Sequence, residues 1–221
     1  GVIECCQTLK ARMEPVRQKM DNPTWKELVK ECWNQGVDLS AHYFTNPTEK
    51  GAFRYNVYAA AAIEVELDVL TGQSQINRVD LLYDGGESMN PDLDIGQIEG
   101  GFTMGLGYHL TEKMKYDPTT GVALTDGTWE YKPPMPKDIP IDFRITMLKN
   151  NPNPLGILRA KASGEPPLML GSGALFAIKH AAEAARAEIG QDTFFVLNSP
   201  ALVEDRQAAC KLDISQFTFG Q

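Results

Sequence analysis

The sequence Arg159-Ala-Lys-Ala-Ser-Gly-Glu-Pro-Pro-Leu168 sets one glutamate between a glycine and two prolines, directly ahead of a helical pattern over residues 168–188. A proline disfavours the α region for the residue before it, so we expect Glu165 to be extended and outside the helix. The two prolines suit a first helical turn, where a missing N–H costs nothing. A carboxylate on such a stiff loop suits a catalytic base, but a residue that only begins a helix fits the same local pattern.

A second helical pattern opens at Asn90-Pro91 and runs to about Glu112, and its composition is unusual for a helix. Each glycine inside a helix costs up to about 1 kcal/mol relative to alanine. Close approach of the backbone to a ligand or to another helix is the usual reason for such glycines. Gln97 lies near the start of this segment, and its amide both donates and accepts hydrogen bonds. A solvated or capping side chain is the alternative interpretation of Gln97. The glycines of this segment are Gly96, Gly100, Gly101, Gly105 and Gly107.

The remaining patterns alternate between helix and strand. Residues 2–20 have apolar side chains at helical spacing, and Thr24 with Glu27 forms a capping box for a second helix, which we expect to stop at Gly36. Residues 40–51 are expected to be irregular.

Apolar and polar side chains alternate over residues 55–70 and 75–83 around a turn, which predicts a β-hairpin. Further strands are expected at 113–117, 122–128 and 141–148. Hairpins and helices without regular βαβ spacing predict an α+β fold, with hairpins and mixed sheets packed with long helices.

The composition is ordinary for a soluble globular protein: 221 residues, 43% hydrophobic and 23% charged. The net charge of −8 argues against nucleic acid or an anionic membrane as the main partner. No stretch approaches the length of a membrane span. Four cysteines without paired spacing favour a reducing cytoplasm. Because the chain starts at Gly1 without a signal region, we expect a piece of a longer polypeptide.

Several common chemistries lack support in the sequence. The histidines His42, His109 and His180 are far apart and match no HExxH pattern, so we expect no metal ion held by side chains. The glycine pairs Gly105-Leu-Gly107 and Gly171-Ser-Gly173 lack the third glycine of a dinucleotide-binding loop. No cysteine has a local motif that supports a Cys/His nucleophile.

The residues that remain resemble a known family. The segment from Gly85 to Leu106, Gly-Gly-Glu-Ser-Met-Asn-Pro-Asp-Leu-Asp-Ile-Gly-Gln-Ile-Glu-Gly-Gly-Phe-Thr-Met-Gly-Leu, is similar to the second molybdopterin-binding region of the molybdenum hydroxylases, which are the aldehyde oxidases and xanthine dehydrogenases. Residues 161–167 resemble that family's glutamate motif, and residues 176–186 resemble the helix after it. The likeness extends to residues 4–10 and 199–210, so it covers almost the whole chain.

The resemblance implies a role for each singled-out residue. Glu165 matches the family's catalytic base, and Gln97 matches the glutamine that contacts the molybdenum–molybdopterin cofactor. Residues 1–221 would form the C-terminal, second part of the molybdenum domain, and the domains with two [2Fe–2S] clusters and FAD would precede Gly1. The implied reaction oxidises an aldehyde to a carboxylic acid with water as oxygen source and dioxygen as electron acceptor. A cytoplasmic homodimer is usual for the family.

Within the family, residues 128–134 and Ser163 look more like aldehyde oxidases, because xanthine dehydrogenases tend to have valine at the position of Ser163. Two alternatives stay open. One is a xanthine dehydrogenase fragment that hydroxylates purines, an N-heterocyclic substrate class, and uses NAD. The other is a non-catalytic α+β binding or structural module, in which Glu165 only begins a helix.

Overall fold

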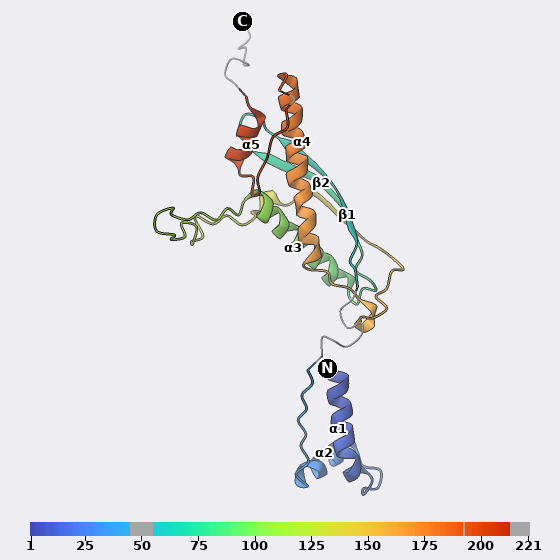
Figure 1. Ribbon diagram of the computed structural model, residues 1–221. Coiled ribbons are helices and arrows are strands. Elements are labelled where there is room, and N and C mark those ends of the chain that lie inside the picture. Colours follow the sequence, from blue (N-terminus) through green and yellow to red (C-terminus); the bar gives the residue numbers. More distant parts are fainter. Residues whose placement is uncertain (45–54, 192, 213–221) are drawn as a thin grey trace. The chain divides into compact units, whose positions relative to one another are not determined.

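The computed structural model describes residues 1–44, 55–191 and 193–212, and the chain divides into two compact units, Gly1–Phe53 and Arg54–Gln221 (Figure 1). Of the segment expected to be irregular, residues 45–51 lie outside the described residues, and residues 40–44 form no helix or strand. In the described part of the chain, no helix has both the length and the apolar character needed to cross a membrane.

The first unit is a pair of helices, α1 (Val2–Arg17) and α2 (Trp25–Asn34). The predicted capping box is confirmed: the Thr24 side chain accepts from the Glu27 N–H at 3.4 Å, and the Glu27 carboxylate accepts from the Thr24 N–H at 2.9 Å. The start of α2 therefore follows from a local signal, because the cap satisfies helix N–H groups that would otherwise lack partners. A small shared core holds the helices together, with Met13, Val16, Leu28 and Cys32 buried.

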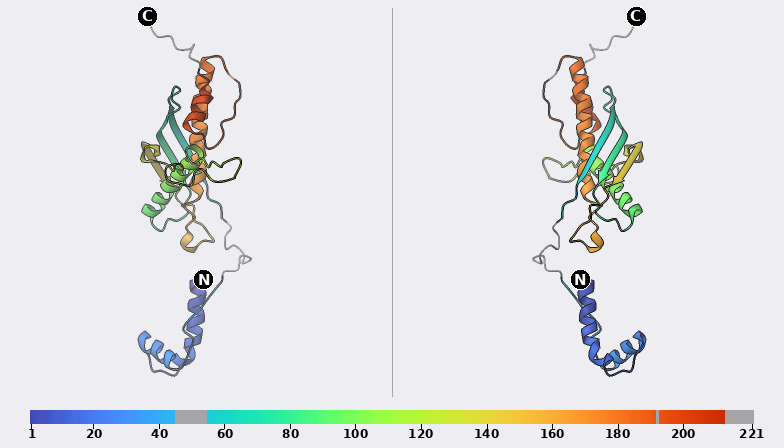
Figure 2. Two further views of the ribbon diagram at one scale, coloured as in Figure 1. Left: turned by 90° about the vertical axis from the view of Figure 1, so that its left-hand side faces the viewer. Right: turned by 90° about the vertical axis from the view of Figure 1, so that its right-hand side faces the viewer.

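The second unit has a three-stranded mixed sheet in the order β1-β2-β3. Strands β1 (Ala59–Leu67) and β2 (Ser74–Tyr83) form the predicted antiparallel hairpin, with a bulge between Glu64 and Val65. Strand β3 (Asp142–Met147) pairs with β2 in parallel. The three strands lie side by side in the right-hand view of Figure 2.

Helices cover the sheet of the second unit. Helix α4 (Ser172–Glu188) packs along β1, and α3 (Pro91–Leu110) contacts α4 (Figure 2). Their shared core contains Val79, Tyr83, Ile98, Phe102, Leu106 and Ile178, none more than 1% exposed. This arrangement confirms the predicted α+β fold class. Short 3-10 helices occur at η1 (Pro136–Asp138) and η3 (Pro166–Gly171), whereas η2 (Ile157–Arg159) is a short turn with non-helical backbone at Leu158.

Two predictions about this unit were wrong or incomplete. The expected strands at 113–117 and 122–128 do not form; only Tyr116 and Ala123 make an isolated bridge. Backbone hydrogen bonds join the two segments only near this bridge, at Asp117–Val122 and Leu124–Lys115, and Tyr116 is 59% exposed. Helix α5 (Val203–Cys210) was not predicted, because its pattern over eight residues is too short to be distinctive.

Tertiary contacts from Arg206 hold α5 in place. Its buried guanidinium donates to Ala201 O at 2.7 Å, to Ser74 Oγ at 2.8 Å and to Leu110 O at 2.8 Å. One side chain therefore joins α5 to the start of β2 and the end of α3. Burial lowers the pKa of this guanidinium, but an arginine titrates so high that the group stays charged.

We expect Arg206→Met to lower the free energy of unfolding by about 3 kcal/mol, since buried acceptors lose a charged donor. Urea unfolding followed by circular dichroism measures the change. Arg144→Met is the matched control, because Arg144 pairs with Asp142 on the surface with its side chain 56% exposed. Solvent screens that exposed pair, so its loss should change stability little. Equal effects of the two substitutions would contradict this account of α5.

Candidate functional site

The start of α3 presents Gln97 on an exposed helix surface. Asn90 caps the helix, its side-chain oxygen accepting from the Leu93 N–H at 3.4 Å, and Pro91 occupies the first turn. Both features were predicted, and they place Gln97 in the second turn. The Gln97 side chain is exposed, so its amide is available for hydrogen bonds.

Four of the five glycines of α3 fall into two groups, and the fifth, Gly107, lies against Glu112 and Pro134. A Cβ on Gly101 would lie 2.1 Å from Gly164 O, and one on Gly105 would lie 2.2 Å from Leu168 O. The predicted close approach is therefore confirmed at these two positions, and the neighbour is the chain's own segment at and before η3. Gly96 and Gly100 instead face open space, with no atom within 4 Å of an added Cβ. Their bare backbone is accessible from outside this chain.

Glu165 occupies the N-cap of η3. Its φ of −80° and ψ of −41° lie in the α region, so the expected extended conformation is wrong. The reason is a turn that the pre-proline preference does not outweigh: Glu165 O accepts from the Leu168 N–H at 3.1 Å and closes the first 3-10 turn. Pro166 and Pro167 occupy the first turn as predicted. The helical run over 168–188 is therefore a 3-10 segment followed by α4.

The structure brings the two predicted site residues into the same neighbourhood. A Cβ on Gly164 would lie 2.9 Å from Gln97 Oε1, so the Gln97 amide rests against the residue that precedes Glu165. Glu165, like Gln97, is exposed in this chain. Gly100 lies one helical turn from Gln97 on α3. We call Gln97, Gly100, Gly164 and Glu165 the Gln97–Glu165 surface.

The loop that leads to Glu165 is joined to the end of β2. Tyr83 OH donates to Ala162 O at 2.6 Å, and the Lys161 ammonium lies 2.6 Å from Asp84 Oδ2. Burial raises the pKa of the Tyr83 phenol, so the hydroxyl stays protonated and remains a donor. Sequence reasoning missed these residues as part of the site. The available signal was an aspartate directly after the apolar run Leu81–Tyr83.

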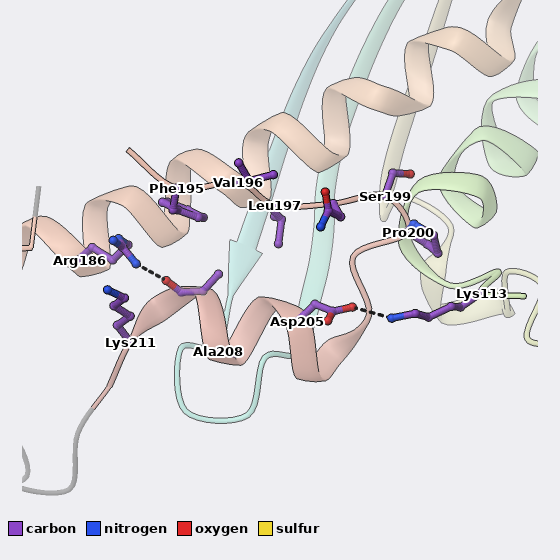
Figure 3. A pocket seen from close by; sticks show the side chains of 12 residues that line it. Lys113, Arg186, Phe195, Val196, Leu197, Ser199, Pro200, Asp205, Ala208 and Lys211 are labelled. Carbon is purple, nitrogen blue, oxygen red and sulfur yellow. Dashed lines mark hydrogen bonds and ion pairs between the residues drawn. The ribbon is translucent and has the colours of Figure 1, made fainter. Parts of the chain in front are cut away.

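The cavity drawn in Figure 3 lies elsewhere, between α5 and the extended segment from Phe195 to Pro200. It has a volume of about 510 Å³, and its mostly uncharged lining includes the basic side chains of Lys113, Arg186 and Lys211 and the acidic Asp205. Arg186 donates to Ala209 O at 3.3 Å and so satisfies a carbonyl at the end of α5. This role is structural, and neither Gln97 nor Glu165 lines the cavity. Among the described residues, no three His, Cys, Asp or Glu side chains are grouped to hold a metal ion.

Comparisons with known proteins agree with the motifs. A family model described as "Molybdopterin cofactor-binding domain" matches residues 1–140. Xanthine dehydrogenase 1 of Arabidopsis thaliana is 42% identical over 225 residues, 95% of this chain and 16% of that protein. Aldehyde oxidase 4 of Rattus norvegicus is 41% identical over 227 residues, 99% of this chain and 17% of that protein. The chain thus spans about a sixth of the length of these curated relatives.

A solved structure shows a fold similar to that of this chain. The crystal structure of quinoline 2-oxidoreductase from Pseudomonas putida 86 superposes with a TM-score of 0.60 and 26% sequence identity. The match covers 68% of this chain and 18% of that one.

The two groups of glycines predict opposite effects of alanine substitution on the free energy of unfolding. Gly101→Ala forces a methyl group against a backbone carbonyl, and such overpacking typically costs about 1–3 kcal/mol. Gly100→Ala adds the same methyl group in open space and gains the better helix propensity of alanine, about 0.5–1 kcal/mol. Urea unfolding of the two variants should therefore show opposite signs. A Gly101→Ala variant as stable as Gly100→Ala would contradict the close approach of η3.

Proposed function

The chain belongs to the molybdenum hydroxylase family of xanthine dehydrogenases and aldehyde oxidases, and from this premise we propose that it forms the second part of the catalytic molybdenum domain in a longer enzyme. The observation that carries the proposal is the contact of Gln97 with Gly164. It joins two motifs that are distant in sequence, one with an exposed amide and one with an exposed carboxylate. The remaining domains, with two [2Fe–2S] clusters and FAD, belong to the same proposal.

The residues of the Gln97–Glu165 surface fit a molybdenum–molybdopterin cofactor. A pterin has an edge of alternating hydrogen-bond donors and acceptors, and the exposed Gln97 amide offers both kinds of group. Gly100 leaves the α3 backbone uncovered, so a flat ring system meets no side chain there. We infer that Gln97 and the bare surface of α3 contact the cofactor, and that the protein supplies no ligand to the metal from this chain.

In the proposed reaction, an aldehyde and water give a carboxylic acid, two protons and two electrons. A bound molybdenum centre would supply the redox chemistry, and iron–sulfur clusters and FAD elsewhere in the longer enzyme would carry the electrons to dioxygen. Glu165 acts as general base: its carboxylate takes the proton from the oxygen that attacks the substrate carbon. The first turn of η3 fixes the backbone of Glu165 through the bond to Leu168, and a base so placed loses little freedom on reaction.

We propose that the substrate is an aldehyde, on the strength of residues 128–134 and Ser163, which resemble aldehyde oxidases. A purine is the second candidate, because the Arabidopsis xanthine dehydrogenase is as similar to this chain as the rat aldehyde oxidase. We further propose a cytoplasmic homodimer, as is usual in the family.

Paired substrates separate these candidates. We expect the enzyme that carries this chain to oxidise benzaldehyde with a kcat/KM at least about tenfold above that for xanthine, because a pocket built for one class leaves buried polar groups unpaired with the other. Steady-state kinetics with dioxygen and with NAD as acceptors measure both ratios. The reverse preference would assign the purine reaction.

The role of Glu165 is tested by its neutral isostere. We expect Glu165→Gln in the molybdenum-loaded enzyme to lower kcat by about 10²–10⁴-fold or more, the usual worth of a general base, while molybdenum content stays near normal. Glu99→Gln is the matched control, because Glu99 is exposed and lies two residues beyond Gln97, on the opposite side of α3. Undiminished turnover in Glu165→Gln removes this residue from the mechanism. A purified enzyme without bound molybdenum would support the non-catalytic module instead.

A further inference from the structure

Asp84 and Lys161 form an ion pair that is almost completely shielded from water. The ammonium nitrogen lies 2.6 Å from Asp84 Oδ2, and the two side chains are 0% and 6% exposed. Asp84 also accepts from Asn151 Nδ2 at 2.7 Å and from the Gly86 N–H at 3.2 Å. A buried carboxylate needs such partners, but a buried ion pair often adds no more stability than apolar side chains of similar size. Its presence therefore calls for another reason.

Backbone contacts fasten the same two segments together. Gly86 and Ala160 form an antiparallel bridge, and the Lys161 N–H donates to Gly85 O at 2.9 Å. Gly86 has a φ of +67°, and a Cβ there would lie 2.6 Å from Arg159 O. Only glycine fits this crossing. The turn after β2 is thus attached directly to residues 159–161.

The attached segment is strained. Leu158 and Arg159 are adjacent non-glycine residues with φ of +51° and +66°, in the left-handed region. Such residues persist only where the surrounding structure holds them, and they cluster at functional sites. Here the holding contacts include the Glu87 and Asn153 N–H groups, which both donate to Arg159 O, at 2.9 and 2.8 Å.

Further hydrogen bonds hold the chain between Lys161 and Glu165. Ala162 O accepts from Tyr83 OH at 2.6 Å, and the Ala162 N–H donates to Tyr55 OH at 3.2 Å. Gly164 then meets Gly101 and the Gln97 side chain. The segment 161–165 is therefore held by contacts at Lys161, at Ala162 and at Gly164, the residue before Glu165.

We propose that Asp84 and Lys161 are positioning residues for Glu165. The buried pair fixes the segment 159–162 against the end of β2, and so sets where the base lies relative to the substrate. This inference rests on the proposed function, in which Glu165 is the base. Apolar replacements of the pair could keep the fold, but they would not reproduce the direction that the charged hydrogen bonds impose.

The test uses Lys161→Met and Asp84→Asn in the molybdenum-loaded enzyme, with Lys161→Arg as the variant that keeps the charge. We expect the first two to lower kcat per bound molybdenum by about 10–100-fold, as loss of a supporting residue typically does, with KM little changed. Lys161→Arg should recover most of the loss. In a second readout on the same proteins, trypsin should cleave after Arg159 faster in Lys161→Met and Asp84→Asn than in the wild type.

Two controls separate positioning from general stability. Arg206→Met removes a buried charge from α5 and should lower stability without faster cleavage at Arg159 or lower kcat per molybdenum. Lys149→Met removes an exposed lysine near β3 and should change nothing.

Wild-type kcat and wild-type cleavage in Lys161→Met and Asp84→Asn would overturn the inference. So would losses that merely match those of Arg206→Met. If Lys161→Met does not fold, Asp84→Asn and Lys161→Arg carry the same comparison. A wild-type enzyme that binds molybdenum but oxidises neither benzaldehyde nor xanthine would refute the proposed function instead, and the cleavage rates would still decide whether the ion pair holds the segment.

Discussion

The close contact between the backbone of α3 and the segment 164–171 is the constraint on which the rest of the second unit depends. Gly101 and Gly105 leave no room for a side chain against Gly164 O and Leu168 O, and Gly171 meets Gly105 in the same way. The contact sets the start of α4, and α4 in turn covers β1 of the hairpin. It also brings Gln97 beside the residue before Glu165. One packing requirement therefore shapes the core and the candidate site together.

The end of β2 is the second organising point. Tyr83 is fully buried in the core, yet its hydroxyl reaches the loop that leads to Glu165, and Asp84 continues the connection through Lys161. Strand β2 is the central strand of the sheet, and its last residue, Tyr83, is paired with Ala59 on one side and Met147 on the other. Attaching a strained loop to such a strand limits the loop's movement. The site thus takes its rigidity from the sheet, although its own residues lie on a helix and a loop.

Features with strong local signals could be predicted from the sequence. The capping box at Thr24, the Asn90-Pro91 helix start and the alternating hairpin each depend on residues close together in the chain. Features that depend on distant residues could not. Glu165 adopts an α conformation because a 3-10 turn outweighs the pre-proline preference, and α5 is held by the bonds of Arg206 to two remote segments, at Ser74 and Leu110. Gln97 and Glu165 were singled out by residue type and resemblance, whereas the Asp84–Lys161 pair joins positions too distant for any local pattern.

At Gly101 and Gly105, the contact between α3 and the segment 164–171 is made by main-chain atoms. Every residue has the same carbonyl and Cα atoms. Most substitutions of neighbouring residues therefore leave the distances between α3 and the segment 164–171 unchanged. Side chains that border a substrate can then diversify without displacing the carboxylate of Glu165. Under the proposed function, a lineage can in this way acquire new substrates while Glu165, the proposed base, keeps its position.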